Sequence, residues 1–357
     1  MSELRKILDL WRDARESGEE ICLATVVEIE GSSYRKPGAH MLLTRGGRRA
    51  GTISGGCLEV EVQKKAWWLT ESGATVQRYS TFFEEDSEMP YGLGCGGTVS
   101  VLFERGQNAH RVLAALEQSA ESCAAVAIVF VIDADTSESV GSRLILSENG
   151  NALFEASAPA GSLVLAQHAL SERRSLWVQG PTSFFVEYVV PPTELFVFGA
   201  GDDAQPLVAF ARALGWRITV VDGRSNLATK ERFPLANQVF ALRSLDDLAL
   251  TERSAAVILT HSYEQDRAAL QALLPRELAY LGILGPRRRT ERLLKEVAPH
   301  LGRTLAECLL QLRAPVGLNI GAKDPASIAL AIVAEIHAVI EGRLGLKSPG
   351  CASVAHV

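Results

Sequence analysis

The chain has 357 residues, of which 47% are hydrophobic and 22% are charged, and its formal net charge is −6. This length allows about two domains, because single cores rarely grow far beyond roughly 250 residues. The composition excludes a disordered chain, and acidic charge spread along the sequence argues against a nucleic-acid-binding protein.

Residues 1–20 carry apolar side chains at helical spacing, with Leu4, Ile7, Leu8 and Trp11 among mixed charges. The pattern predicts an amphipathic helix and not a signal peptide. The longest apolar run, residues 124–132, is too short for a bilayer, which needs about 20 residues. We therefore expect a cytoplasmic protein that does not associate with membranes.

Segments rich in β-forming residues follow, and they predict an α+β domain with an antiparallel sheet. The expected strands are residues 21–30, 40–53 with a fold-back at Gly46 and Gly47, 75–81 and 97–104. Residues 109–190 carry weaker patterns, although 124–132 indicates a buried strand. No internal repeat is visible in the sequence.

A cysteine stands where a glycine-rich loop meets a predicted helix. In GTISGGCLEVEV, residues 51–62, Cys57 follows two glycines, and the helix is indicated by Leu58, Val62, Ala66 and Leu69. The free N–H groups and the positive dipole of a helix end stabilise a thiolate. Glu59 is close enough to act as a proton acceptor or a ligand. The alternative is a tight connection that happens to contain a small residue.

A second cysteine lies in an even more glycine-rich loop, YGLGCGGTVSV, where glycines occupy positions 92, 94, 96 and 97 around Cys95. A thiol with so little bulk around it can face a large ligand. Zinc is a poor candidate because the two cysteines lack paired ligand spacing, whereas a soft thiolate suits a transition metal or sulfur transfer. The acidic residues 82–90 form either a docking loop for a basic partner or a solvated loop.

The pair Pro191 and Pro192 marks a domain boundary, because neither a helix nor a central strand tolerates it. We expect domains at 1–190 and 193–345, followed by a tail at 346–357. After the boundary, strand-like and helix-like segments alternate, which predicts a Rossmann-like parallel sheet covered by helices on both faces. The last helix has clear ends, with Asp324 as N-cap, Pro325 in first position and Gly342 beyond the end.

The loop of LFVFGAGDDAQPL matches a dinucleotide-binding pattern between a strand and a helix. Gly199 permits the tight turn, Gly201 allows a pyrophosphate to approach, and Ala204 lets helix and strand pack closely. Asp222, at the end of the next strand, is expected to accept from a ribose hydroxyl, whereas Arg224 would favour a phosphate. Asp202 and Asp203 suit the helix dipole but would repel a phosphate.

Further polar residues fall at the carboxyl ends of the strands, where ligands bind in such sheets. Thr260 and His261 follow one strand, Gly285 and Pro286 another, and residues 319–323 a third segment. Arg287 opens a basic cluster, residues 287–289, that could clamp an anion. The alternatives are a structural histidine and a solvated helix face.

Together, EGSSYRKPGAHMLL, GTISGGCLEVEV, YGLGCGGTV, VFGAGDDAQPLV, VVDGR, LTHSYEQD, GILGPRRR and APVGLNIGAKDPASIALAIVAEI resemble the XdhC/CoxI family. Members of this family are maturation factors of xanthine and carbon monoxide dehydrogenases. The motifs occur in order at both ends of the chain.

The resemblance implies an accessory factor, not an enzyme, that binds the molybdenum cofactor (molybdopterin) and shields it while a cysteine desulfurase installs a sulfido ligand. The factor then delivers the cofactor to an apo xanthine or CO dehydrogenase. The family pattern falls on Cys57, Glu59 and Cys95, which are the possible molybdenum contacts, and on Gly199 and Gly201. A phosphate-binding crevice in the second domain would hold the pterin's anionic tail, and a homodimer is a further expectation.

Three other functions remain open from the sequence, and one of them is a scaffold whose sites are vestigial and which acts through its surfaces. An NAD(P)-dependent oxidoreductase would use the glycine loop, Asp222, and His261 as general acid and base. A persulfide sulfur carrier would use Cys57 or Cys95 as a nucleophilic thiolate.

Overall fold

The computed structural model describes residues 2–80, 97–134, 140–154, 158–241, 245 and 248–344. These residues form two compact units, one spanning Glu3–Pro192 and the other running from Thr193 onward. Cys95, the acidic segment 82–90 and the tail 346–357 lie outside the described residues.

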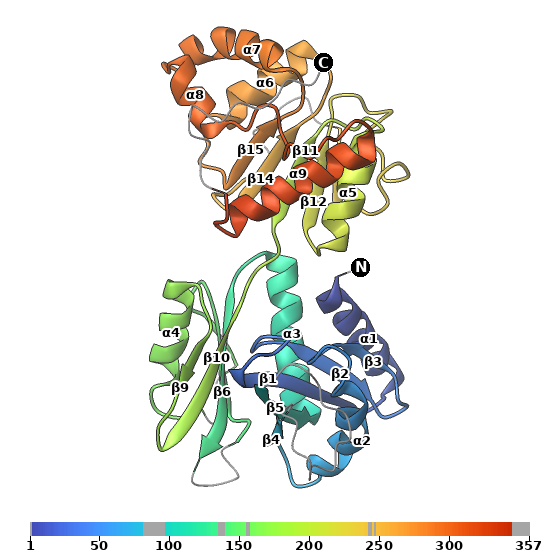
Figure 1. Cartoon of the computed structure of the whole chain (residues 1–357), viewed down its shortest axis with the longest axis vertical. Helices are drawn as coiled ribbons and strands as arrows, with labels where there is room; N and C mark the ends of the chain where they lie inside the picture. Colours follow the sequence, from blue (N-terminus) through green and yellow to red (C-terminus); the bar gives the residue numbers. More distant parts are fainter. Residues whose placement is uncertain are drawn as a thin grey trace. The chain divides into compact units, whose positions relative to one another are not determined.

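The first half of the N-terminal unit, residues 3–105, is one module of sheet and helices. Its strands form an antiparallel sheet in the order β3-β2-β1-β5-β4 (Figure 1). The elements, in chain order, are α1 (Glu3–Ser17), β1 (Ile21–Gly31), β2 (His40–Thr44), β3 (Arg49–Gly51), α2 (Glu59–Leu69), β4 (Thr75–Ser80) and β5 (Gly97–Arg105).

The second half, residues 106–189, repeats the same succession of elements and the same strand order, β8-β7-β6-β10-β9, again antiparallel. The elements are α3 (Gly106–Ser122), β6 (Val126–Ala134), β7 (Arg143–Ser147), β8 (Ala152–Phe154), α4 (Ser162–Glu172), β9 (Leu176–Val178) and β10 (Thr182–Val189). The structure therefore contains an internal repeat that is not visible in the sequence. We call the two halves the first and second modules.

The repeat extends to individual positions. Both leading helices end at a residue of positive φ, Gly18 in the first module and Cys123 in the second. The pairing of β1 with β5 shifts around Val27, and that of β6 with β10 shifts around Ile132. The buried positions of the leading helices also correspond in order: Ile7 with Val112, Leu8 with Leu113, Trp11 with Leu116, and Ala14 with Ser119.

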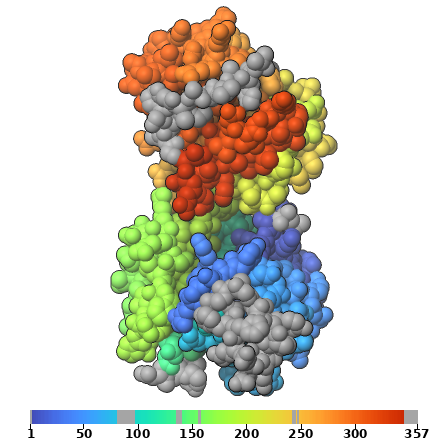
Figure 2. Space-filling view, viewed as in Figure 1, coloured from blue at the N-terminus to red at the C-terminus, as the bar shows by residue number. Residues whose placement is uncertain are grey.

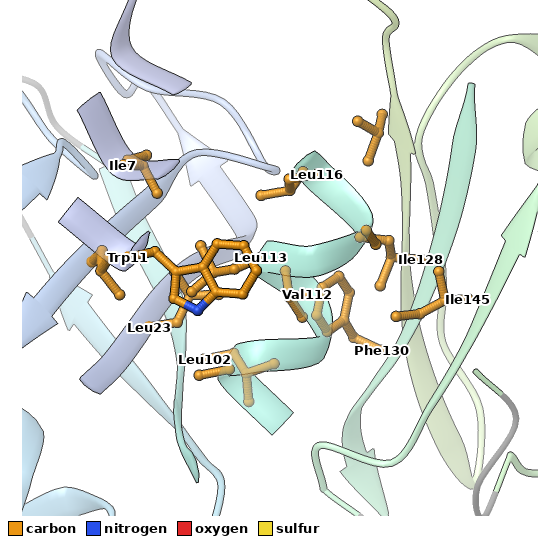
Figure 3. Packing of buried hydrophobic residues seen from close by; sticks show 14 of the residues in the cluster. Ile7, Trp11, Leu23, Leu102, Val112, Leu113, Leu116, Ile128, Phe130 and Ile145 are labelled. Atoms are coloured by element: carbon orange, nitrogen blue, oxygen red, sulfur yellow. The ribbon is translucent and has the colours of Figure 1, made fainter. Parts of the chain in front are cut away.

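One hydrophobic core joins the two modules. In Figure 3, α3 presents Val112 and Leu116 between the sheets, with Leu23 of the first module on one side and Phe130 of the second on the other. Trp11 of α1 enters the same core and donates a hydrogen bond from its indole nitrogen to His110 at 2.8 Å. The modules therefore form a single packed body.

Two buried ion pairs cross between the modules at corresponding positions. His40 opens β2 and contacts Glu187 of β10 at 3.0 Å, whereas Arg143 opens β7 and contacts Glu104 of β5. Arg143 and Glu104 are almost wholly buried, at 1% and 0% side-chain exposure. In each pair, one carboxylate oxygen has no hydrogen-bond partner among the described residues. Burial raises the pKa of Glu104, and the nearby charges of Arg143 and His40 oppose that rise.

The C-terminal unit is built on a parallel sheet in the order β13-β12-β11-β14-β15. This order corresponds to the first five strands, 3-2-1-4-5, of the six-stranded Rossmann order. Its strands are β11 (Glu194–Phe198), β12 (Arg217–Val221), β13 (Gln238–Phe240), β14 (Ser254–Ile258) and β15 (Tyr280–Ile283). The predicted fold class is confirmed in both units.

Helices cover both faces of this sheet. Buried side chains of α5 (Ala204–Ala213) and α9 (Pro325–Ile340) pack on one face. Those of α6 (Tyr263–Leu273), α7 (Arg287–His300) and α8 (Leu305–Gln311) pack on the other. Figure 2 shows α9, in red, at the surface of the unit. The predicted caps of α9 are confirmed, since Asp324 accepts from Ala326 and Ser327. Within the described residues, no helix combines the length and apolar character required to cross a membrane.

Candidate functional site

The loop that carries Cys57 connects β3 to α2. Cys57 is exposed and lies just before Leu58, the N-cap residue of α2. A side chain added at Gly56 would meet no atom within 4 Å, so the backbone beside the sulfur is open to a ligand. The ring of Tyr34, 74% exposed, lies beside Gly55. The thiol is therefore accessible, and an exposed aromatic ring lies beside the same glycine loop.

Ser54 organises this loop, and the sequence analysis missed it. Its hydroxyl oxygen accepts hydrogen bonds from the backbone N–H groups of Gly56 at 3.2 Å and Leu58 at 3.1 Å. The thiol of Cys57 also donates to it, at 3.4 Å. The N–H groups of Gly56 and Leu58 therefore point to a hydroxyl and not to the sulfur. Ser54 does not have the capping-box spacing to Glu59, so no standard signal in the sequence indicates this role.

Glu59 is buried beneath the loop. Its carboxylate accepts from the Ser54 hydroxyl at 2.6 Å and from the backbone N–H groups of Ser54 and Ile53. Burial disfavours the charged form, but these hydrogen bonds outweigh it and lower the pKa of Glu59. We predicted Glu59 as a proton acceptor or ligand beside Cys57. The structure instead places Ser54 between them, so Glu59 holds the loop.

Cys95 lies outside the described residues, so its position relative to Cys57 stays a prediction. Within the described part of the chain, no cluster of three or more His, Cys, Asp and Glu side chains could hold a metal ion.

In the C-terminal unit, the glycine loop between β11 and α5 has the predicted tight turn. Gly199 has φ of 124°, and an added Cβ would lie 2.3 Å from the carbonyl oxygen of Leu259. Only glycine fits there. Ala204 is fully buried at the start of α5, as close packing of helix and strand requires.

Asp222 follows β12 and is wholly buried as a side chain. One carboxylate oxygen accepts from the backbone N–H of Arg224 and from its Nε, both at 2.9 Å. The other accepts from the backbone N–H of Ala200 and from Arg224 Nη2, both at 2.7 Å. Burial raises the pKa of Asp222, but the hydrogen bonds from Arg224 and Ala200 reverse the shift and lower it. Asp222 thus anchors Arg224 to the glycine loop.

The two carboxylates after the loop are both paired. Asp202 accepts from Arg232 at 2.8 Å, and Asp203 lies 2.7 Å from Nε2 of His261. His261 adopts φ of 59°, a backbone conformation that is uncommon for residues other than glycine, and its side chain is 62% exposed. The structure therefore places His261 beside the glycine loop, as predicted from its position after β14.

The arginines of the predicted anion clamp have different partners in the structure. Arg287 is exposed and contacts Glu291, one turn further along α7, at 2.9 Å. Arg289 instead reaches the buried Asp266, which also accepts from the hydroxyl of Thr260. The interaction of Arg289 with Asp266 was missed, since no local pattern joins two residues on different helices.

Comparisons with known proteins agree with this architecture. A family model described as the XdhC and CoxI family matches residues 14–80, and the XdhC Rossmann domain matches residues 195–336. The chain is 34% identical to a probable xanthine dehydrogenase subunit of Bacillus subtilis, over 90% of this chain and 93% of that protein. The chain therefore belongs to the XdhC and CoxI family.

Two further relatives extend along nearly the whole chain. The molybdenum cofactor insertion chaperone PaoD of Escherichia coli is 27% identical over 97% of this chain and 91% of its own length. A crystal structure of a xanthine dehydrogenase from Bacillus halodurans superposes with a TM-score of 0.78 at 31% identity, covering 98% of both chains.

Proposed function

We propose that the protein is a molybdenum cofactor insertion chaperone for a xanthine dehydrogenase-type molybdoenzyme, acting as an accessory factor rather than an enzyme. The similarity to PaoD over 97% of the chain is the observation that carries this proposal. The family relationship extends through both units, so it covers the Cys57 loop and the glycine loop of the Rossmann domain.

The Cys57 loop supports the proposal chemically. Its sulfur is exposed, soft and flanked by open glycine backbone, which suits contact with molybdenum in a bulky cofactor. The hydrogen bond from the thiol to Ser54 requires the thiol proton, so a metal contact would replace that hydrogen bond. The hydroxyl of Ser54 remains directed at Glu59, and the loop keeps its shape when the sulfur changes partner.

The test is to purify the protein from molybdate-fed cells and to measure bound pterin and molybdenum per chain. Wild type should carry both, Cys57→Ala should carry about tenfold less or lower still, and Cys123→Ala, the matched control, should equal wild type. Near-zero loading in wild type and Cys57→Ala alike would end the proposal. Equal substantial loading in these two proteins would remove Cys57 as the contact.

The finer steps extend the same proposal. The chaperone shields the cofactor while a cysteine desulfurase installs the sulfido ligand, works in the cytoplasm as a homodimer, and passes the cofactor to the apo-dehydrogenase. Tagged protein should then retain both partners on an affinity column, and light scattering should give twice the chain mass. A persulfide on Cys57, seen by mass spectrometry after incubation with a desulfurase and cysteine, would favour a sulfur carrier instead.

A further inference from the structure

We propose that the crevice of the Rossmann-like unit recognises a phosphomonoester through Arg224 and discriminates against the unphosphorylated ribose of NAD. Two kinds of ligand share this chemistry, a 2′-phosphorylated nucleotide and a pterin phosphate. Only the pterin phosphate rests on the proposed function.

The first step concerns the acceptor that a ribose would need. An ionised carboxylate offers about four lone-pair positions. Those of Asp222 meet four donors, the backbone N–H of Ala200 and three N–H groups of Arg224, at 2.7 to 2.9 Å. Its side chain has 0% exposure. Asp222 therefore cannot accept from a ribose hydroxyl without giving up one of these bonds.

The second step concerns what replaces that acceptor. Arg224 turns Nε and Nη2 toward Asp222, and Nη2 also approaches the carbonyl oxygen of Thr260 at 3.4 Å. Among the hydrogen bonds of the described residues, none involves Nη1. The side chain is 41% exposed. Arg224 consequently presents a fixed cationic edge with two N–H donors, and a phosphate accepts readily from such an edge.

The third step is the place of this edge in the sheet. Ala200 follows β11 and Thr260 follows β14, which are neighbouring strands. The helix after β11 packs on one face of the sheet and the helix after β14 on the other. Such a switch point is where ligands enter sheets of this kind. Arg224 contacts Thr260 directly and is linked to Ala200 through Asp222, so it lies at this switch point.

The fourth step is why the phosphate would not sit at the start of α5. The carboxylates of Asp202 and Asp203 stand there, held by Arg232 and His261 at 2.8 and 2.7 Å. An anion at that point would have to displace a carboxylate from its cation. At Arg224 the hydrogen-bonded carboxylate, Asp222, lies on the buried side, and the charge of Asp203 also acts on Arg224 while its carboxylate is held by His261.

The experiment measures equilibrium dissociation constants of the full chain for matched probes. These are NADP⁺ against NAD⁺, 2′,5′-ADP against 5′-AMP, and neopterin monophosphate against neopterin. In wild type, at least one phosphorylated probe should bind about 10–100-fold more tightly than its counterpart, the value of a charge-assisted hydrogen bond. The nucleotide arms and the pterin arm distinguish the two sources of the phosphate.

Variants separate recognition from folding. Arg224→Gln keeps a donor for Asp222 and should abolish the discrimination, as should Asp222→Asn/Arg224→Gln, which leaves no buried charge. Arg174→Gln, which removes an exposed arginine of the N-terminal unit, is the control and should keep it. Equal binding of both members of every pair, no binding of any phosphorylated probe, or unchanged discrimination in folded Arg224→Gln would overturn the proposal. Pterin and molybdenum loading of the purified chaperone is a separate measurement, so failure of either proposal leaves the other standing.

Discussion

The two modules of the N-terminal unit share one plan but differ in their loops. The first module connects β3 to α2 through residues 52–58, which include the exposed Cys57. In the second module the sequence between β8 and α4 contains no cysteine and ends Ala-Pro-Ala-Gly. The connection from β4 to β5 takes residues 81–96, whereas that from β9 to β10 takes only residues 179–181.

This difference indicates that the core positions of both modules support the fold, whereas the loops carry the candidate site. Positions facing the shared core correspond in both modules because packing constrains them, whereas the loops were free to diverge. Among the described residues of the two modules, the exposed thiol of Cys57 lies in a loop of the first module. The second module contributes half of the core and one member of each crossed ion pair. Substitutions at matched positions of the two modules test this separation.

The largest effect is expected at the crossed ion pairs. Arg143→Met leaves Glu104 buried without its partner, which should cost about 3–5 kcal/mol of unfolding free energy. His40→Ala should cost less, about 1.5–3 kcal/mol, because its pair is slightly more exposed. Hydrogen exchange of peptides from β1 and β6 in the full chain measures both values.

A double variant tests whether charge is the cause. Arg143→Met with Glu104→Leu replaces the pair by apolar groups and should recover most of the stability, since buried pairs often exchange with little loss. If the double variant is no more stable than Arg143→Met, then packing and not the unpaired charge explains the cost.

A smaller effect is expected at high pH from Cys22, whose matching position in β6 is Ala127. Burial raises the pKa of the Cys22 thiol from 9.0 to about 12. The unfolded chain loses this proton at a lower pH than the folded chain does. The stabilisation contributed by the buried neutral thiol is therefore complete below pH 9 and is lost as the pH rises to about 12. Between pH 7 and 10.5, wild type should lose about 2 kcal/mol more than Cys22→Ala. If hydrogen exchange of wild type and Cys22→Ala shows the same pH dependence, then the Cys22 thiol is not the cause of the loss of stability.

The smallest effect is expected where the leading helices end. Gly18 and Cys123 have φ of 70° and 53°, and a side chain in this region costs roughly 1–2 kcal/mol. Gly18→Ala should therefore destabilise the unit by about 1 kcal/mol, and Cys123→Gly should stabilise it by a similar amount. Calorimetry of the full chain should show a lower melting temperature for Gly18→Ala and a higher one for Cys123→Gly. Shifts of the same sign would show that the two helix ends are not equivalent.

The sequence predicted features that depend on local pattern. The helix after Cys57, the turn at Gly199, the caps of α9 and the alternation of the Rossmann-like unit all follow from neighbouring residues. The repeat escaped notice because matched positions share burial but not identity, as Trp11 and Leu116 do.

Contacts between segments far apart in the chain could not be predicted from the sequence either. His40 and Glu187 are separated by 147 positions, and nothing in either segment indicates the other. Asp222 and Arg224 are neighbours in sequence, yet their spacing could not decide which of them a ligand would meet. The Ala200 N–H that completes the set of donors to Asp222 comes from another strand end.

The junction between the modules has one more consequence. β5 ends at Arg105 and α3 begins at Gly106, so the chain passes from one module to the next without a spacer. α3 packs between the two sheets, and the two crossed pairs connect them. We expect little bending at this junction, because the two sheets share one core. If the cofactor binds beside Cys57 as proposed, we expect the loop of residues 52–58 to adjust while the shared core of the two modules keeps its shape.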